Sequence, residues 1–173
     1  MDSVAFLRNV NQGQRGQPAT HDIVAAFERA GAHDVRPFQS NGTVLFTAVD
    51  PDAVAESARG HLALDCGIDT VVFVRPLTFV AQVVERHADA SSFTRRELTL
   101  FDVDTLIADD RAAGAQAMRR RCAVVEHGAG WAVVENDADR QSNGTPTIEA
   151  ALGTPATSRG LPTLLRLIDR HGL

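Results

Sequence analysis

Two strand-like stretches flank a turn at residues 35–47, which read VRPFQSNGTVLFT. Val35 to Phe38 and Thr43 to Thr47 carry the β-branched and aromatic residues that are typical of strands. The link between them contains Asn41-Gly42, a pair that tolerates the positive φ angles of a tight turn. The stretch therefore predicts a β-hairpin.

A strand and a helix are predicted on each side of this hairpin. Before it, residues 4–7 form a short apolar run typical of a buried strand, and residues 18–31 show helical spacing that ends at a glycine. After it, residues 50–67 begin with an Asp-Pro cap and end at a glycine, and residues 70–74 are a β-branched run. The order is β-α-β-β-α-β, which is the split βαβ or ferredoxin-like arrangement.

Strand and helix signals recur less regularly over the second half of the chain. We expect a helix ending near His87, a strand at residues 98–101, a short helix around residues 106–107, strands at residues 122–125 and 131–134, and helices at residues 148–152 and 161–168. The predicted fold class is α+β with two ferredoxin-like (split βαβ) lobes, the second less regular. The first, βαββαβ lobe spans residues 1–75, and a second α+β lobe with C-terminal helices spans residues 76–173.

Composition excludes several classes of function. All 17 basic residues are arginine, so Schiff-base chemistry on a lysine and a Walker-type lysine are excluded. There is no tyrosine, so no phenol serves as an acid or base. The net charge of −5 disfavours nucleic acid as a partner, because nucleic-acid binding draws on a positive surface.

No apolar run is long enough to span a membrane, and no export signal precedes the first strand. Cys66 and Cys122 are isolated thiols, which fits a reducing compartment. We therefore expect a cytoplasmic protein with no membrane partner. The six histidines show no metal-ligand spacing, and we expect no metal and no cofactor.

Three segments of the chain resemble a bacterial family known only as domain of unknown function 1697. They are Phe6-Leu7-Arg8 with Val10-Asn11 and Gly13, the turn Gln39-Ser40-Asn41-Gly42, and the stretch from Leu152 to Arg159. The resemblance spans nearly the whole chain. It implies an α+β fold of two related lobes and no assigned activity.

The sequence departs from that family at three places. Asn9 replaces the usual glycine, and Asn41-Gly42 reverses the family's glycine-asparagine order. After Arg159 the chain continues with Gly160 to Thr163, where the family has asparagine-tryptophan-asparagine-threonine. A family ligand that used that tryptophan is in doubt for this chain.

The first candidate ligand site is the loop from Arg8 to Gly16, with Arg8, Asn11 and Gly13 as its binding residues. The loop leaves a strand and enters a helix, so backbone N–H groups and the Arg8 guanidinium favour an anion. Acylphosphatases have a similar loop and arginine in the same strand order, but their glycine-valine-glutamine-glycine-valine signature is missing here. The alternative is a plain connection in which Arg8 pairs with a carboxylate.

Two further candidates are Ser40 with Asn41 in the hairpin turn, and Thr157, Ser158 and Arg159 before the last helix. Turn chemistry explains the first pair without a ligand, and hydroxyls before a helix are most often caps. We expect Arg8 and Asn11 to share one concave surface with a group from Thr157 to Arg159, because both segments precede helices.

Three functions remain open. The first is a small-molecule or anion-binding module without catalysis, and the second is a hydrolase of an activated phosphate or acyl group, with no catalytic residue assigned. The third is a homo-oligomeric interaction protein, so that the chain is a monomer or a homodimer. The pentapeptide Gln-Ser-Asn-Gly-Thr occurs at residues 39–43 and 141–145, and its repetition is explained by convergent turn chemistry.

Overall fold

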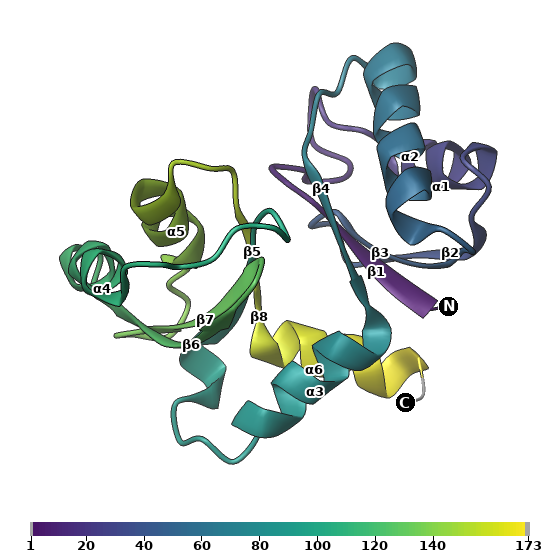
Figure 1. Cartoon of the computed structure of the whole chain (residues 1–173). Helices are drawn as coiled ribbons and strands as arrows, with labels where there is room; N and C mark the ends of the chain where they lie inside the picture. The colour runs from purple at the N-terminus through teal and green to yellow at the C-terminus, as the bar shows by residue number, and fades with distance from the viewer. Residues whose placement is uncertain (1, 172–173) are drawn as a thin grey trace. The chain divides into compact units, whose positions relative to one another are not determined.

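The computed structural model describes residues 2–171, and the chain divides into two compact units, Met1–Phe79 and Val80–Leu173. Each unit has a four-stranded antiparallel sheet packed with helices (Figure 1). This confirms the predicted α+β class with two split βαβ lobes. The sequence places the boundary after residue 75, whereas the observed division falls within helix α3 (Leu77–His87).

The first unit has the strand order β2-β3-β1-β4. Strands that are consecutive in the chain are thus separated in the sheet, except for the β2–β3 hairpin, and α1 and α2 lie side by side (Figure 1). Its elements are β1 (Asp2–Leu7), α1 (Thr20–Arg29), β2 (His33–Phe38), β3 (Thr43–Thr47), α2 (Pro51–Cys66) and β4 (Val72–Pro76).

Alternation along the two central strands builds the core of the first unit. Ala5 of β1 pairs with Val44 of β3, and both belong to the buried cluster that also contains Phe27 of α1. The Phe27 and Phe46 rings pack at 5.2 Å between centroids. Because successive side chains of a strand point to opposite faces, every second residue of β1 and β3 faces these helices.

Both ends of α2 follow from the sequence. The Asp50 carboxylate accepts a hydrogen bond of 3.1 Å from the Ala53 N–H, and Pro51 occupies the first helical turn, where its missing N–H costs nothing. Gly67 ends the helix with a φ of 66°, a conformation that favours glycine.

The second unit has the order β6-β7-β5-β8, which repeats the order of the first unit. Helices α4 and α5 pack against β6 and β5, and α6 packs against β5, β8 and the 3₁₀ turn η1. Its elements after α3 are η1 (Phe93–Arg95), β5 (Arg96–Leu100), α4 (Asp110–Arg119), β6 (Cys122–Gly128), β7 (Trp131–Asn136), α5 (Gly144–Leu152), β8 (Thr157–Gly160) and α6 (Leu161–His171).

Two sequence expectations for this unit are wrong. The segment around Leu106 is not helical. The helix of this region is α4, which begins at Asp110, and the preceding Asp109 caps it by accepting a hydrogen bond of 2.9 Å from the Ala112 N–H. Helix α4 is rich in alanine and has few large apolar residues, so its periodicity is weak. Thr157 to Arg159 is not a helix cap but belongs to strand β8, whose Ser158 is in register with Thr99 of β5.

A buried carboxylate organises the start of α5. Glu97, 3% exposed, accepts hydrogen bonds from Asn136 Nδ2 at 3.1 Å, Ser142 Oγ at 2.6 Å and the Gly144 N–H at 2.6 Å. Ser142 and Gly144 belong to the second copy of the repeated pentapeptide. The first copy links β2 to β3 whereas the second leads into α5, so the two copies occupy different places in their units.

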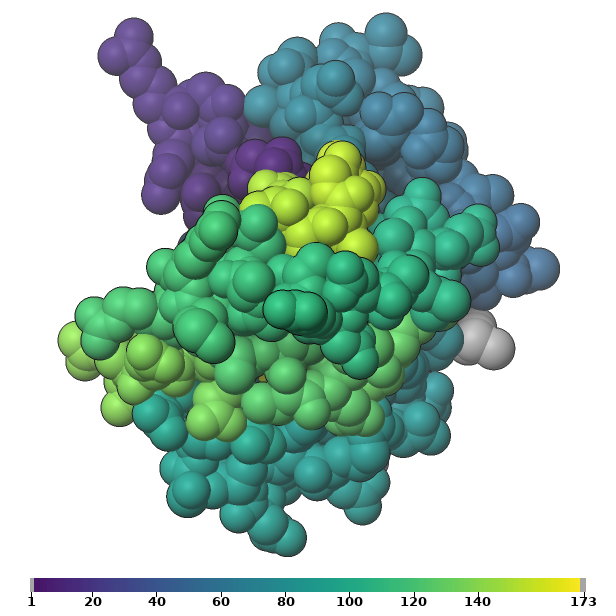
Figure 2. Space-filling view, turned by 60° about the vertical axis from the view of Figure 1, so that its left-hand side comes forward, coloured from purple at the N-terminus to yellow at the C-terminus, as the bar shows by residue number. Residues whose placement is uncertain are grey.

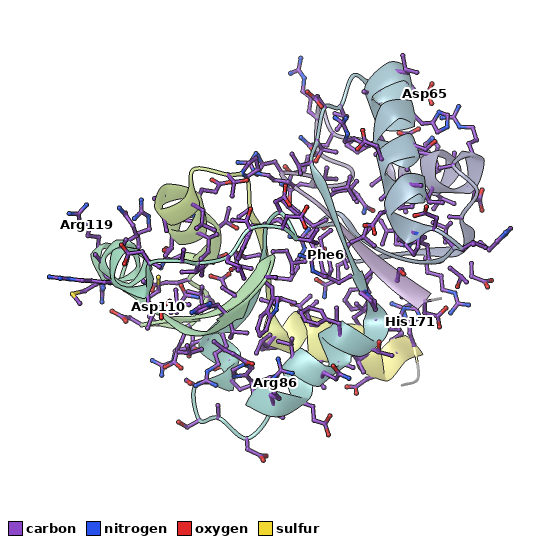
Figure 3. All side chains as sticks on the ribbon, in the orientation of Figure 1. Phe6, Asp65, Arg86, Asp110, Arg119 and His171 are labelled. Atoms are coloured by element: carbon purple, nitrogen blue, oxygen red, sulfur yellow. The ribbon has the colours of Figure 1, made fainter. Side chains whose placement is uncertain are left out.

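The C-terminal end of α3 is bound to the second sheet through polar contacts. His87 Nε2 lies 2.7 Å from Glu126 Oε2, and His87 Nδ1 lies 2.7 Å from Arg96 Nη1. Because a guanidinium only donates, Nδ1 accepts and Nε2–H donates to Glu126. Arg86, labelled in Figure 3, pairs with Glu126 at 3.0 Å and lies over the Trp131 ring, 5.6 Å from its centroid.

We predict that Glu135→Gln lowers the free energy of unfolding by about 1 kcal/mol at neutral pH. The Ser92 hydroxyl at 2.6 Å and the Arg96 guanidinium at 2.8 Å hold the pKa of Glu135 below its ordinary value of 4.5. A carboxylate whose pKa is lowered by folding stabilises the protein above its unfolded pKa, and this contribution disappears as the pH falls through the folded pKa. Urea unfolding should therefore show a gap between the two proteins that closes as the pH falls below 4.5.

The matched control for this pH series is Glu85→Gln, at an exposed position of α3. It should leave the stability unchanged across the same pH range. A constant gap between Glu135→Gln and the parent protein from neutral to acid pH would contradict the assignment.

Candidate functional site

Three loops of the first unit meet at one end of its sheet. The Leu7 N–H donates to the Gly42 carbonyl at 2.8 Å, the Gln12 N–H to the Ser40 carbonyl at 2.7 Å, and the Arg8 N–H to the Val71 carbonyl at 2.9 Å. Because β1 runs antiparallel to β3 and β4, the end of β1 lies beside the starts of both. We call residues 8–18, 39–42 and 70–71 the loop end of the first sheet.

The predicted residues Arg8, Asn11, Gly13, Ser40 and Asn41 are therefore brought to the same end of the sheet. The sequence leaves this open, because it does not fix which ends of the strands coincide. The tip of the loop is exposed, and the purple atoms of the N-terminal segment lie at the surface in Figure 2.

The hairpin turn has the predicted link of residues 39–42, but its left-handed residues are not both in the Asn41-Gly42 pair. The link has four residues, and its positive φ angles are at Gln39 (57°) and Gly42 (70°) rather than at Asn41. A Cβ on Gly42 would lie 3.0 Å from the Cβ atoms of Leu7 and Val10, so the glycine also allows the turn to approach the loop closely. Asn41 Oδ1 accepts from Thr43 Oγ1 at 2.8 Å.

Most backbone donors of the Arg8 loop already have acceptors within the protein. The Asn11 N–H donates to Gln17 Oε1 at 3.0 Å, and the Gly13 N–H donates to the Pro18 carbonyl at 3.4 Å. Gly13 has a φ of 80°, so its role in the loop is conformational. Side chains are thus the principal groups that this loop offers to a ligand.

The start of α1 is occupied by a carboxylate. Helix α1 begins at Thr20, and the preceding Ala19 N–H donates to Asp22 Oδ2 at 2.8 Å. A negative side chain in the first turn satisfies a free N–H group and interacts favourably with the helix dipole. An anion at the loop end is therefore expected near Arg8 rather than at the helix start.

Gln12 is the residue of this region that sequence reasoning missed. It is 9% exposed, and its Oε1 accepts from Thr20 Oγ1 at 2.9 Å. Its Nε2 is buried and has no hydrogen-bond partner among the residues that the structure describes. A glutamine in a polar loop carries no periodic signal, so nothing in the sequence marks it.

Thr70 was also not singled out as a site residue. Its hydroxyl donates to the Arg8 carbonyl at 2.6 Å and so fixes the backbone from which the Arg8 side chain leaves. Arg8 itself is half-buried at the end of β1.

Thr157 and Arg159 lie in the second unit, and both are buried in β8. Arg159 Nη1 donates to Thr157 Oγ1 at 2.9 Å and to the Ser158 carbonyl at 2.8 Å, and burial lowers the pKa of Arg159 to about 10. Arg8 and Asn11 belong to the first unit, so the surface that they are expected to share with Thr157 to Arg159 stays a prediction.

Neither a membrane helix nor a metal cluster is found within residues 2–171. None of the helices there is both long and apolar enough to cross a membrane. No three histidine, cysteine or acidic side chains of that part of the chain are grouped closely enough to hold a metal ion.

The geometry defines a two-lobed α+β protein with a polar loop cluster at one end of its first sheet. The family model described as protein of unknown function (DUF1697) matches residues 1–128, and the chain belongs to this family. The segment from Leu152 to Arg159, which also resembles the family, lies beyond the matched residues.

A solved structure has the same fold. It is the conserved bacterial protein SP0830 from Streptococcus pneumoniae, at a TM-score of 0.60 and 12% sequence identity, over 96% of this chain and 98% of that one. At this identity the similarity shows the fold alone. No curated protein matches the sequence.

Proposed function

We propose that this protein is a binding module for a small anionic molecule, held at the loop end of the first sheet. The observation that carries the proposal is the buried Gln12 Nε2, a donor without an acceptor at the junction of the Arg8 loop and the Ser40 turn. Buried polar groups are nearly always hydrogen-bonded, and an unpaired one calls for a partner that the protein itself does not supply.

The side chains around this junction suit an anion. Arg8 brings a guanidinium, which binds carboxylate and phosphate with two parallel hydrogen bonds. Ser40 and Asn41 add a hydroxyl and an amide from the neighbouring turn. In a chain of net charge −5, the positive charge of Arg8 favours a negative ligand at this end of the sheet.

We predict that Arg8→Ala weakens the binding of inorganic phosphate or phosphorylated metabolites at least tenfold. Hydrogen bonds to a charged group contribute about 1.5–3 kcal/mol, which corresponds to about a tenfold to hundredfold change in affinity. Thermal shift is a suitable first measurement, because a ligand at 100 times its Kd stabilises the native state by about 2.7 kcal/mol. Calorimetric titration then gives the affinity.

Arg36→Ala is the control, because Arg36 is an exposed arginine on β2 of the same unit. It should bind the same ligands as the parent protein. The proposal fails if no phosphorylated or carboxylated compound stabilises the parent protein, or if Arg8→Ala binds as tightly as Arg36→Ala does.

The two other candidate functions predict different experimental results. A hydrolase of an activated phosphate or acyl group would turn over acyl phosphate above background, and Arg8→Ala would abolish that turnover. A homo-oligomeric interaction protein would show a concentration-dependent mass by light scattering. We propose a cytoplasmic monomer or homodimer that does not bind nucleic acid.

A further inference from the structure

We propose that the second unit carries a separate binding site, which we call the arginine pocket, for a small anion that also bears a hydrogen-bond donor. The pocket has a volume of about 290 Å³, and its polar lining includes Arg95, Arg96, Arg140, Gln141, Ser142 and Thr163. It is formed entirely by residues of the second unit.

The arginine pocket is not the second unit's version of the loop end. Its residues come from the start of β5, the segment after β7 and the junction of β8 with α6. Strand β5 occupies the place in its sheet that β1 occupies in the first sheet, and the loop end lies where β1 finishes. The two sites therefore use opposite ends of related sheets.

Charge at the pocket favours an anion. Arg95 and Arg96 share one carboxylate, Glu135, with N–O distances of 3.6 and 2.8 Å. Arg140 is exposed and makes no ion pair within the described part of the chain. Glu97 lies in the lining, and the Asp139 carboxylate accepts from the lining residue Thr94 at 3.0 Å. Arg140 is therefore the guanidinium of the lining that an external anion can pair with.

The carboxylate of Glu97 is already occupied by protein donors. It accepts from Asn136, Ser142 and the Gly144 N–H, so it has little capacity left to hold an arginine of the pocket. An external anion can therefore bind Arg140 without competing with Glu97.

A second observation marks the same place. Residues 2–171 contain two buried side-chain polar atoms without a hydrogen-bond partner, and the one outside the loop end is Gln141 Oε1. It belongs to a residue that lines the pocket. A hydroxyl or an ammonium group beside the anionic group of the ligand would donate to this carbonyl oxygen.

The walls of the pocket are held in place without a ligand. Arg95 Nη1 donates to the Asp137 carbonyl at 2.8 Å, and Asn136 Oδ1 accepts from the Asn143 N–H at 3.0 Å. Thr163 Oγ1 accepts from Arg166 Nη2 at 3.1 Å, which leaves the Thr163 hydroxyl proton available. Binding to such a preorganised site requires little ordering of side chains.

Size narrows the class of ligand. Liquid water occupies about 30 Å³ per molecule, so the pocket holds the equivalent of roughly ten waters. A hydroxy acid or a three-carbon polyol phosphate fits within this space. We therefore infer a small phosphorylated or carboxylated compound with a free hydroxyl group.

The second pentapeptide copy then has a function of its own. Gln141 supplies the unpaired oxygen. The Ser142 hydroxyl and the Gly144 N–H both donate to the Glu97 carboxylate, and the lack of a side chain at Gly144 leaves room for that carboxylate at the start of α5. The first copy has none of these three roles. The sequence identity of the two copies is therefore still explained by convergent turn chemistry rather than by a shared function.

The test is calorimetric titration of the full chain with glycerol 3-phosphate and with propyl phosphate, which lacks the hydroxyl groups. We expect glycerol 3-phosphate to bind, and propyl phosphate to bind at least fivefold more weakly. Arg140→Ala should weaken glycerol 3-phosphate at least tenfold, because it removes an exposed guanidinium without disturbing packing. Gln141→Leu should remove the difference between the two compounds.

Two controls separate this site from other arginines. Arg119→Ala removes an exposed arginine at the end of α4, labelled in Figure 3, and should not affect binding. Arg8→Ala removes the guanidinium of the loop end, so glycerol 3-phosphate binding that persists in Arg8→Ala and is lost in Arg140→Ala belongs to the arginine pocket. Binding that is lost in Arg8→Ala and kept in Arg140→Ala would overturn the arginine pocket while supporting the loop end.

Two further outcomes also count against the inference. Equal affinities for glycerol 3-phosphate and propyl phosphate in the parent protein would overturn the required donor. No binding of either compound at millimolar concentration would overturn the pocket as an anion site, whatever the result for inorganic phosphate at the loop end.

Discussion

Gly144→Ala should lower the free energy of unfolding of the second unit by about 3 kcal/mol or more. A Cβ at this position would overlap Thr99 Oγ1 and would lie 2.9 Å from Glu97 Oε1 and 3.0 Å from Ser158 Oγ. Neither a buried carboxylate nor two hydrogen-bonded hydroxyls can move aside without breaking their own contacts. Urea unfolding followed by the fluorescence of Trp131, the single tryptophan, reports on this unit directly.

Gly114→Ala is the matched control within the same unit. Gly114 lies inside α4, and a Cβ there would meet nothing within 4 Å. Since alanine favours a helix interior by up to about 1 kcal/mol over glycine, this variant should be slightly more stable than the parent protein. Equal stability of Gly144→Ala and the parent protein would show that the start of α5 can shift freely.

Glu97→Leu should cost about 3 kcal/mol as well, for an electrostatic rather than a steric reason. The leucine leaves the buried Gly144 N–H without an acceptor, removes one of the two acceptors of Asn136 Nδ2, which keeps the Arg95 carbonyl, and frees the exposed Ser142 hydroxyl. Each buried donor that loses its partner costs about 1–3 kcal/mol, although some of these groups will recover water. The same Trp131 fluorescence measurement applies.

Glu97→Gln distinguishes the hydrogen bonds from the volume of the side chain. Its carbonyl oxygen can still accept from Asn136 and Gly144, and its NH₂ group can donate to the Ser142 hydroxyl after that hydroxyl rotates. We expect a loss of only about 1 kcal/mol. If the glutamine and leucine variants lose the same stability, the donors to Glu97 are not what stabilises the start of α5.

The elements of the first unit could be predicted from the sequence because several of their boundaries carry a local signal, although β4 lies two residues later than predicted. Asp50-Pro51 and Gly67 mark the two ends of α2, and both act as expected. The predicted bounds of β3, Thr43 to Thr47, are those observed. Where turn, cap and periodicity agree, local sequence is sufficient to define the elements.

The second unit was harder to predict from the sequence because two of its elements are defined by tertiary contacts. Strand β8 has four residues, TSRG, which are extended because they pair with β5. Helix α4 has mostly alanine and polar residues, so its buried face consists of Ala113 and Ala117. Neither element has the strong apolar periodicity on which prediction depends.

The candidate residues were named from the sequence, but their grouping was not. Arg8 and Ser40 lie at one end of the first sheet because β1 and β3 are antiparallel, which is a property of the sheet and not of either loop. Gln12 and Gln141 became visible only as unpaired buried atoms. Such atoms depend on all their neighbours, and no local pattern encodes them.

The strand order also has a consequence for folding during synthesis. In each sheet the first strand in the chain pairs with the last. One edge of β1 therefore stays unpaired until β4 (Val72–Pro76) has been synthesised, and one edge of β5 stays unpaired until β8 (Thr157–Gly160) has been synthesised. Such non-local pairing slows folding, and domains generally fold in order as the chain emerges from the ribosome. The first sheet can close while the second is still being translated. The second can close only once residue 160 has left the ribosomal tunnel, so β5 remains without one neighbour until β8 has been synthesised and has emerged.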